Sequence, residues 1–74
     1  NIRVNSVHPG IIKTPMADQP DVEEYLKQLE KDIPLRRRAE VVEVSNLVVY
    51  LASDDSSYST GSQFVVDGGM ISDL

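Results

Sequence analysis

The sequence predicts an α/β fold in which two parallel strands of an open sheet are joined by helical segments. Residues 1–7 alternate in a run rich in β-branched side chains, residues 40–53 carry apolar side chains at helical spacing, and residues 64–66 form a short apolar run. The helical segments between the strands are long enough for a crossover, so the two strands are expected to run parallel.

The first strand is expected over residues 1–8 and should end in a sharp turn. Proline removes a hydrogen-bond donor from a strand, and glycine permits backbone conformations that other residues resist, so Pro9 and Gly10 should end it. Residues 9–35 then form a proline-punctuated loop that carries one short amphipathic helix, from Asp21 to about Asp32.

A second helix is expected over residues 40–53, followed by the last strand over residues 62–67. Apolar side chains on this helix extend beyond a narrow stripe, so a sheet or a partner subunit should cover it on more than one side. Two strands and two helices leave sheet edges and apolar faces unpaired, and the chain begins its first strand directly at Asn1. We therefore expect the chain to be the C-terminal part of a longer single domain.

Composition argues against several classes of protein. The chain has 74 residues and a formal charge of −5, so nucleic acid and anionic membranes are not expected partners. It has no cysteine and one histidine, His8, so neither a disulfide framework nor a metal site is expected. No apolar stretch approaches the roughly 20 residues of a membrane-spanning helix. The lack of cysteine fits a reducing cytoplasm, which is the expected location.

The turn after the first strand is the best candidate for a binding site. Ligands of open parallel sheets lie beyond the carboxyl ends of the strands, where this turn is expected. Gly10 would let the backbone approach a planar ring or a phosphate, and the Thr14 hydroxyl offers a hydrogen-bond donor and acceptor. The alternative is an ordinary loop that ends a strand, because Pro-Gly turns are common.

Several motifs in register resemble one enzyme family. The run from Asn1 to Gly10, followed by Ile12 and Thr14, resembles the sixth strand and following loop of short-chain dehydrogenases/reductases. The remaining motifs are similar to the last helix and last strand of that family: Pro34-Leu35 before an arginine, Glu43-Val44, Leu51-Ala52-Ser53-Asp54, Tyr58-Ser59-Thr60-Gly61 and Val66-Asp67-Gly68-Gly69. Within the family, the likeness is greatest to bacterial 3α/20β-hydroxysteroid dehydrogenases.

The resemblance implies a Rossmann-type doubly wound parallel sheet, and hydride transfer between NAD or NADP and a secondary alcohol or ketone. Carried over by position, Pro9 and Gly10 line the nicotinamide, the Ile12 backbone binds its carboxamide, and Thr14 binds the carboxamide or the pyrophosphate. Met16 contacts the substrate, and the segment from Met16 to about Leu35 forms a lid over it. The family usually has glycine where this chain has Arg36, which leaves the geometry of that loop open.

Catalytic groups of the family are expected to lie outside these 74 residues. Its catalytic tyrosine is followed four residues later by lysine, but Tyr25, Tyr50 and Tyr58 are followed at that spacing by Leu29, Asp54 and Ser62. The four glycines form no dinucleotide-binding loop. The 74 residues alone are therefore expected to be inactive. His8 and Asn5 are interpreted as structural residues.

The sequence leaves several alternatives open. The preferred substrate is a hydroxysteroid or another cyclic alcohol, with a 3-oxoacyl thioester as the alternative, and the choice between NAD and NADP is not determined. The excess apolar surface of the last helix suggests a homotetramer or homodimer, and a truncated, non-catalytic interaction module is the competing hypothesis. The basic run of residues 36–38 fits a surface or subunit contact better than a phosphate site. The acidic residues of the two helices are interpreted as a solvated face.

Overall fold

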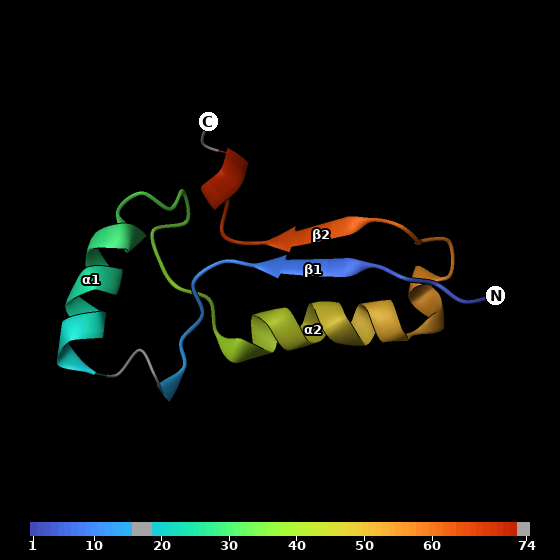
Figure 1. Ribbon diagram of the computed structural model, residues 1–74, viewed down its shortest axis with the longest axis horizontal. Coiled ribbons are helices and arrows are strands. Elements are labelled where there is room, and N and C mark those ends of the chain that lie inside the picture. Colours follow the sequence, from blue (N-terminus) through green and yellow to red (C-terminus); the bar gives the residue numbers. More distant parts are fainter. Residues whose placement is uncertain (16–18, 73–74) are drawn as a thin grey trace.

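The computed structural model describes residues 1–15 and 19–72, with the side chain of residue 72 excepted. The main elements are β1 (Ser6–Pro9), α1 (Pro20–Glu30), α2 (Val41–Ala52) and β2 (Gln63–Val66), as Figure 1 shows. Two short 3-10 turns, η2 (Asp54–Ser56) and η3 (Met70–Ser72), flank the second strand.

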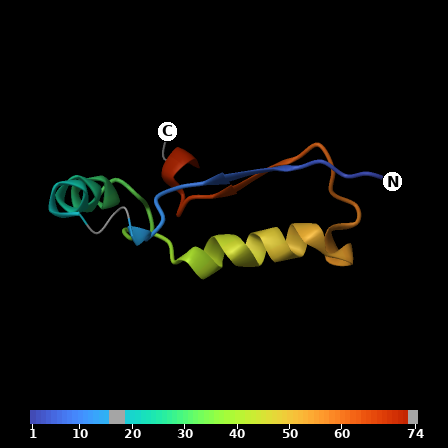
Figure 2. The same cartoon turned by 60° about the horizontal axis from the view of Figure 1, so that its bottom comes forward.

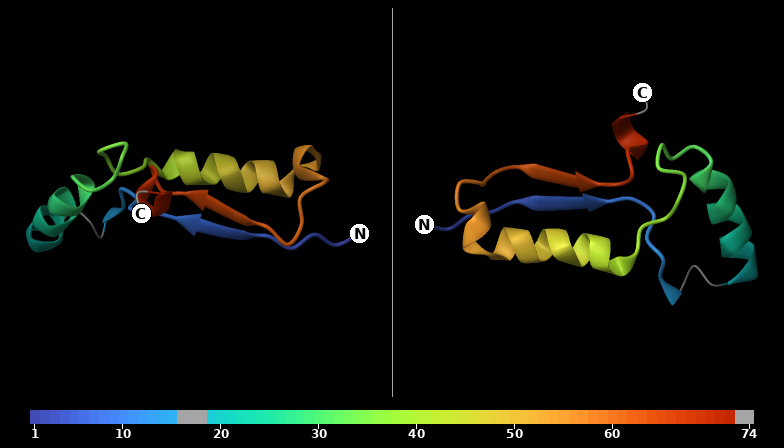
Figure 3. Two further views of the ribbon diagram at one scale, coloured as in Figure 1. Left: turned by 90° about the horizontal axis from the view of Figure 1, so that it is seen from above. Right: turned by 180° about the vertical axis from the view of Figure 1, so that it is seen from behind.

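The two strands form one parallel sheet in which Ser6 pairs with Gln63 and Pro9 with Val66. Helix α2 lies along one face of this sheet, and the opposite face is uncovered (Figures 2 and 3). The α/β prediction with parallel strands is thereby confirmed. Ile2 and Val4, in the segment that leads into β1, have relative exposures of 90% and 70%. This is the arrangement expected of one part of a doubly wound sheet, in which further elements cover the second face.

The first strand is shorter and later than predicted. It was expected over residues 1–8, but β1 covers Ser6–Pro9. Residues 1–5 are held by irregular contacts instead of a strand ladder: the Gly61 N–H donates to the Val4 carbonyl at 2.7 Å, and the Val4 N–H donates to the Thr60 hydroxyl at 3.2 Å. A side-chain acceptor replaces a backbone one, so regular pairing begins only at Ser6.

Pro9 lies inside β1, although it was predicted to end the strand. The N–H groups of Ser6 and Gly10 donate to the carbonyls of Ser62 and Val66, both at 3.0 Å. Successive N–H groups of a strand point to opposite sides in the plane of the sheet. The Pro9 nitrogen therefore faces away from β2, and its missing hydrogen costs no bond in this ladder.

The remaining elements lie within one or two residues of their expected positions. Helix α1 begins at Pro20, which suits the first turn of a helix, and ends at Glu30 rather than at about Asp32. A turn follows in which the Ile33 N–H donates to the Glu30 carbonyl. Ile33 is 2% exposed, and its Cγ2 lies only 2.9 Å from the position that a Cβ on residue 68 would take. Glycine at position 68 thus lets the base of the α1 segment pack against the end of β2.

Arg3 holds the C-terminal end of α2. Its guanidinium donates to the carbonyls of Leu51 and Ser53, at 3.3 Å each, and to the Ser56 carbonyl at 2.8 Å. A cation at this end complements the partial negative charge of the last helical carbonyls. Asn5, interpreted as a structural residue, binds the turn that leads into β2: its side-chain amide donates to the Ser59 carbonyl and accepts from the Ser62 N–H. The N-terminal segment is therefore fastened to the far end of the chain by side chains.

We predict that Arg36→Gly stabilises the protein. Arg36 has a φ of 59°, a left-handed conformation that side chains with a Cβ resist. Relief of this strain, less the greater chain entropy that glycine has when unfolded, should raise the free energy of unfolding by about 0.5–1 kcal/mol in a urea titration. Arg36→Ala keeps the Cβ and serves as the control. An equal gain in both variants would show that the side chain, and not the backbone, is responsible.

Candidate functional site

The loop after β1 is bound to the segment that leads into α2. The Ala39 N–H donates to the Ile11 carbonyl, and the Lys13 N–H donates to the Ala39 carbonyl, both at 2.9 Å. Ile12 and Ala39 thus form a parallel bridge. The bridge holds the loop beyond the carboxyl end of β1, the edge where ligands of open parallel sheets bind.

Packing against Asp67 requires glycine at position 10. A Cβ built on Gly10 would lie 2.9 Å from both Cα and Cβ of Asp67, closer than real contacts allow. The reason given from the sequence was close approach to a ligand, whereas the structure shows close approach between the ends of the two strands. Asp67 is fixed at that point because its carboxylate accepts hydrogen bonds from the Gly69 and Ile71 N–H groups, at 2.9 and 3.1 Å.

Three of the four residues expected to bind the cofactor line one groove. Pro9, Ile12 and Thr14 form one wall of an open, mainly apolar hollow of about 440 Å³. The other lining residues all come from α2: Val41, Val44, Ser45, Val48 and Val49. Gly10 does not line this groove. The structure therefore brings Pro9, Ile12 and Thr14 together and places Gly10 against Asp67 at the strand end.

Thr14 also borders a second, more polar hollow. This hollow has a volume of about 410 Å³ and lies between the loop and α1, with Lys13, Pro15, Glu23 and Arg38 as its other lining residues. Thr14 is thus the residue that the two hollows share. Met16, expected to contact the substrate, lies outside the described residues.

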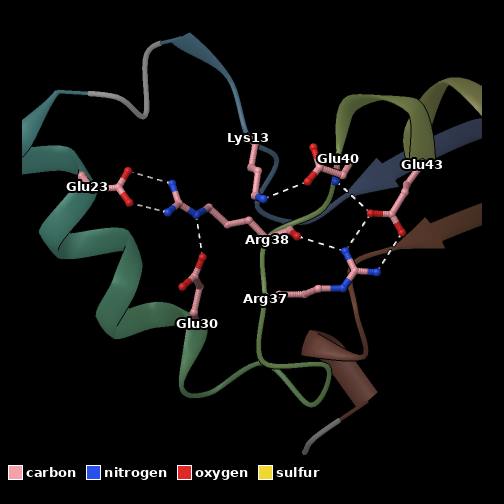
Figure 4. Close-up of polar contacts among 7 residues, drawn as sticks. All are labelled: Lys13, Glu23, Glu30, Arg37, Arg38, Glu40 and Glu43. Carbon is pink, nitrogen blue, oxygen red and sulfur yellow. Dashed lines mark hydrogen bonds and ion pairs between the residues drawn. The ribbon is translucent and has the colours of Figure 1, made fainter.

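An ion-pair cluster joins α1 to the segment before α2 (Figure 4). The Nε of Arg38 donates to Glu30 at 2.6 Å, and its two terminal nitrogens bind both oxygens of Glu23. Arg38 is 8% exposed. The hydrogen bond from the Arg38 guanidinium lowers the pKa of Glu23, and bonds to the two carboxylates raise the pKa of Arg38. These residues were interpreted as surface charges, and that interpretation is wrong because they bind one another within the chain.

A second set of ion pairs lies at the N-terminus of α2. Arg37 binds both carboxylate oxygens of Glu43, at 2.7 and 2.9 Å, and Lys13 binds Glu40 at 2.8 Å. Glu43 also accepts from the Glu40 N–H, which completes a capping box. Hydrogen bonds from the Arg37 guanidinium, which has the larger effect, and from the Glu40 N–H lower the pKa of Glu43 to about 2. Arg37 is therefore occupied by a carboxylate and does not contribute to an open phosphate site.

The pKa of Glu43 predicts a pH dependence of stability. Its folded pKa of about 2 lies below the ordinary value of 4.5, so the ionised carboxylate favours the folded state above pH 4.5. That contribution is lost as the pH falls from 4.5 to about 2. We expect Glu43→Gln to be less stable than wild type at pH 7 and to lose stability less steeply over this window in urea titrations. Parallel pH curves for the two proteins would contradict the assignment.

Within residues 1–15 and 19–72, no group of histidine, cysteine, aspartate or glutamate side chains is placed to bind a metal ion. Every helix in these ranges is too short or too polar to span a membrane. His8 is exposed and its Nε2 lies 2.8 Å from the Ser6 hydroxyl.

The profile of the enoyl-(acyl carrier protein) reductase family matches residues 1–71. A 3-alpha-(or 20-beta)-hydroxysteroid dehydrogenase of Mycobacterium tuberculosis is 63% identical over 73 residues, which are 99% of this chain and 26% of that protein. The chain belongs to the short-chain dehydrogenase/reductase family. It spans about a quarter of the length of the curated relatives that it matches.

A second curated relative and a solved structure are also similar to this chain. A trans-4-hydroxycyclohexanecarboxylate dehydrogenase of Sinomonas cyclohexanicum is 52% identical over 69 residues, 93% of this chain and 24% of that protein. The crystal structure of a putative 2-deoxy-D-gluconate 3-dehydrogenase from Agrobacterium tumefaciens, with bound NADP, superposes with a TM-score of 0.84. The identity is 27%, and the match covers 95% of this chain and 29% of that one. The expected Rossmann-type fold is thereby confirmed.

Sequence reasoning missed three side chains that fasten parts of the chain together. Arg3 and Arg38 bind partners in other elements, and Asp67 binds the N–H groups of Gly69 and Ile71 in the turn that follows it. Arg38 could have been singled out by one signal: Glu23 and Glu30 are seven residues apart, so both carboxylates lie on one stripe of a helix.

Proposed function

We propose that the complete protein containing this chain is an NAD- or NADP-dependent oxidoreductase, which transfers hydride between the cofactor and a secondary alcohol or ketone. The observation that carries this proposal is the shared groove of Pro9, Ile12 and Thr14 beyond the carboxyl end of β1. Family membership and the bound NADP of a structural neighbour support the same conclusion. The nicotinamide ring supplies the hydride chemistry at its C4 atom.

The backbone of Ile12 suits the carboxamide of a nicotinamide. In the bridge to Ala39, the hydrogen bonds come from the flanking residues, Ile11 and Lys13. The N–H and C=O of Ile12 therefore point to the side opposite Ala39. A carboxamide needs one acceptor and one donor, and the backbone of a single residue offers both, through its C=O and its N–H.

The other loop residues take complementary roles in this proposal. Pro9 offers a rigid apolar surface to one side of the ring, and the Thr14 hydroxyl, which is exposed, bonds the carboxamide or the pyrophosphate. Gly10 acts indirectly, by letting the strand ends approach so that the loop is held in register. The proton that accompanies the hydride would be passed by a tyrosine outside these 74 residues, which alone should be inactive.

The proposed substrate is a hydroxysteroid or another cyclic alcohol. The names of two relatives favour it, since one acts on hydroxysteroids and the other on a hydroxylated cyclohexane. Val22 and Tyr25 of α1 support it as well, because they expose apolar surface on the segment proposed as the substrate lid. Met16 would add a further contact. A 3-oxoacyl thioester is the alternative, favoured by the description of the matching family.

An absorbance assay of the complete protein distinguishes these substrates. NAD or NADP should be reduced in the presence of a 3α- or 20β-hydroxysteroid or a 4-hydroxycyclohexane carboxylate. A 3-oxoacyl thioester with NADH or NADPH is the comparison. Faster turnover of the thioester would overturn the substrate class but retain the oxidoreductase, and no turnover with either cofactor would contradict the proposed function.

We also propose that the complete protein is a homo-oligomer joined through α2. Val42 is 56% exposed and does not line the groove of Pro9, Ile12 and Thr14. Val44 and Leu47 are less exposed and lie on a different side of the helix from Val42. Light scattering of the complete protein should give a dimer or tetramer for wild type and a smaller species for Val42→Glu. A compact wild-type monomer would contradict this proposal.

A further inference from the structure

Arg38 directs its whole guanidinium group at α1. Its three side-chain nitrogens bind Glu23 in the first turn of the helix and Glu30 at its last residue (Figure 4). The two carboxylates are seven residues apart, about two turns, so they lie on one stripe. Contacts at both ends of one stripe fix the rotation of α1 about its axis as well as its distance from the segment before α2.

Helix α1 depends on this attachment more than on packing. Figure 1 shows α1 at one end of the molecule, apart from the sheet and α2. No residue of α1 is fully buried. Among the described residues, every side-chain hydrogen bond from α1 to another part of the chain ends on Arg38. Removal of this one guanidinium should therefore free α1 to move.

The residue after Arg38 is bound to the loop proposed to contact the nicotinamide. Ala39 donates to the Ile11 carbonyl and accepts from the Lys13 N–H, each at 2.9 Å. These two bonds flank Ile12. The backbone of residues 38–39 thus joins two groups at once: the side chain of Arg38 holds α1, and the backbone of Ala39 holds the loop.

We propose that Arg38 is a positioning residue that couples cofactor binding at the loop to the placement of α1 over the substrate. The proposal rests on the proposed function, since it requires a nicotinamide at Ile12. A cofactor that orders the loop also orders Ala39, and hence Arg38 and the helix bound to it. Coupling between two such sites typically changes binding about 5- to 150-fold.

Hydrogen exchange of the complete protein tests this coupling. Amides of residues 20–30 are followed with and without saturating NADH or NADPH, whichever cofactor shows saturable binding by fluorescence. In wild type, the cofactor should slow their exchange by about tenfold, within the range for coupled sites. In Arg38→Gln, cofactor should slow it by less than about twofold, while residues 9–14 still become protected. Arg38→Lys, which keeps the charge but loses the planar fork, should restore part of the response.

Two further variants keep the test specific. Arg37→Gln removes the neighbouring guanidinium, which binds Glu43 and not α1, and should retain the wild-type response. Glu23→Gln/Glu30→Gln leaves Arg38 in place and should lose the response, so a misfolded Arg38→Gln would not remove the test. A full response in this double variant or in a folded Arg38→Gln would overturn the coupling alone. Failure of wild type to bind either cofactor would overturn the proposed function and the coupling together.

Discussion

Gly10→Ala should reduce both the stability of the complete protein and its affinity for the cofactor. The new Cβ would lie 2.9 Å from Cα and Cβ of Asp67, and neither backbone can move without disturbing β1 or β2. Overpacking of this kind costs about 2 kcal/mol, measurable as a lower free energy of unfolding in urea. A shift of the adjoining loop that breaks one bond to the cofactor should weaken NADH or NADPH binding about tenfold.

Gly61→Ala is the matched control for this prediction. Gly61 has a φ of 68°, so alanine is strained there, but an added Cβ meets nothing within 4 Å. It should cost about 1 kcal/mol of stability and leave cofactor affinity unchanged. If Gly10→Ala also leaves cofactor affinity unchanged, the strand end does not position the loop, and the indirect role assigned to Gly10 is wrong.

Arg3→Met should destabilise the complete protein by about 3 kcal/mol, since bonds from a charged donor to several carbonyls are lost while methionine keeps much of the apolar stem. The carbonyls of Leu51, Ser53 and Ser56 lose the guanidinium that they share. Ser56 is 1% exposed, so water cannot readily replace Arg3 at that point. Urea titration measures the loss.

Arg3→Lys separates the charge from the geometry. One ammonium keeps the charge near the last carbonyls of α2 but cannot reach all the acceptors of the guanidinium fork. It should recover about half of the lost stability. Equal stability of Arg3→Met and wild type would show that α2 ends independently of the N-terminal segment.

Periodic features of the sequence predicted the fold because each is a property of neighbouring residues. The apolar spacing of residues 40–53 predicted α2, found at Val41–Ala52, and the apolar run of residues 64–66 predicted β2. The start of β1 was less predictable. The alternating pattern continues back to Ile2. The Val4 N–H, however, donates to the Thr60 hydroxyl instead of to a backbone carbonyl, and no local sequence pattern predicts such a contact.

The candidate site was predictable only in part. Pro9, Ile12 and Thr14 were selected by resemblance, and the structure places all three on one groove. Contacts between distant residues, such as Arg3 with Ser56 and Arg38 with Glu23, leave no periodic signal and require the fold to be known. The family resemblance pointed to Arg36 as a position where glycine is usual, and the positive φ of Arg36 is the physical reason for that preference.

The most direct test of the central claim is whether the nicotinamide ring lies against Ile12. The complete protein, labelled on isoleucine and threonine methyl groups, would be saturated with NAD or NADP and searched for nuclear Overhauser effects to the nicotinamide protons. The Ile33 methyl, 2% exposed at the base of the α1 segment, is the internal control. We predict a signal from Ile12 and none from Ile33; a signal from Thr14 would assign its hydroxyl to the carboxamide rather than to the pyrophosphate. Saturation by cofactor without a signal at Ile12 would contradict the assignment of this loop as the nicotinamide site.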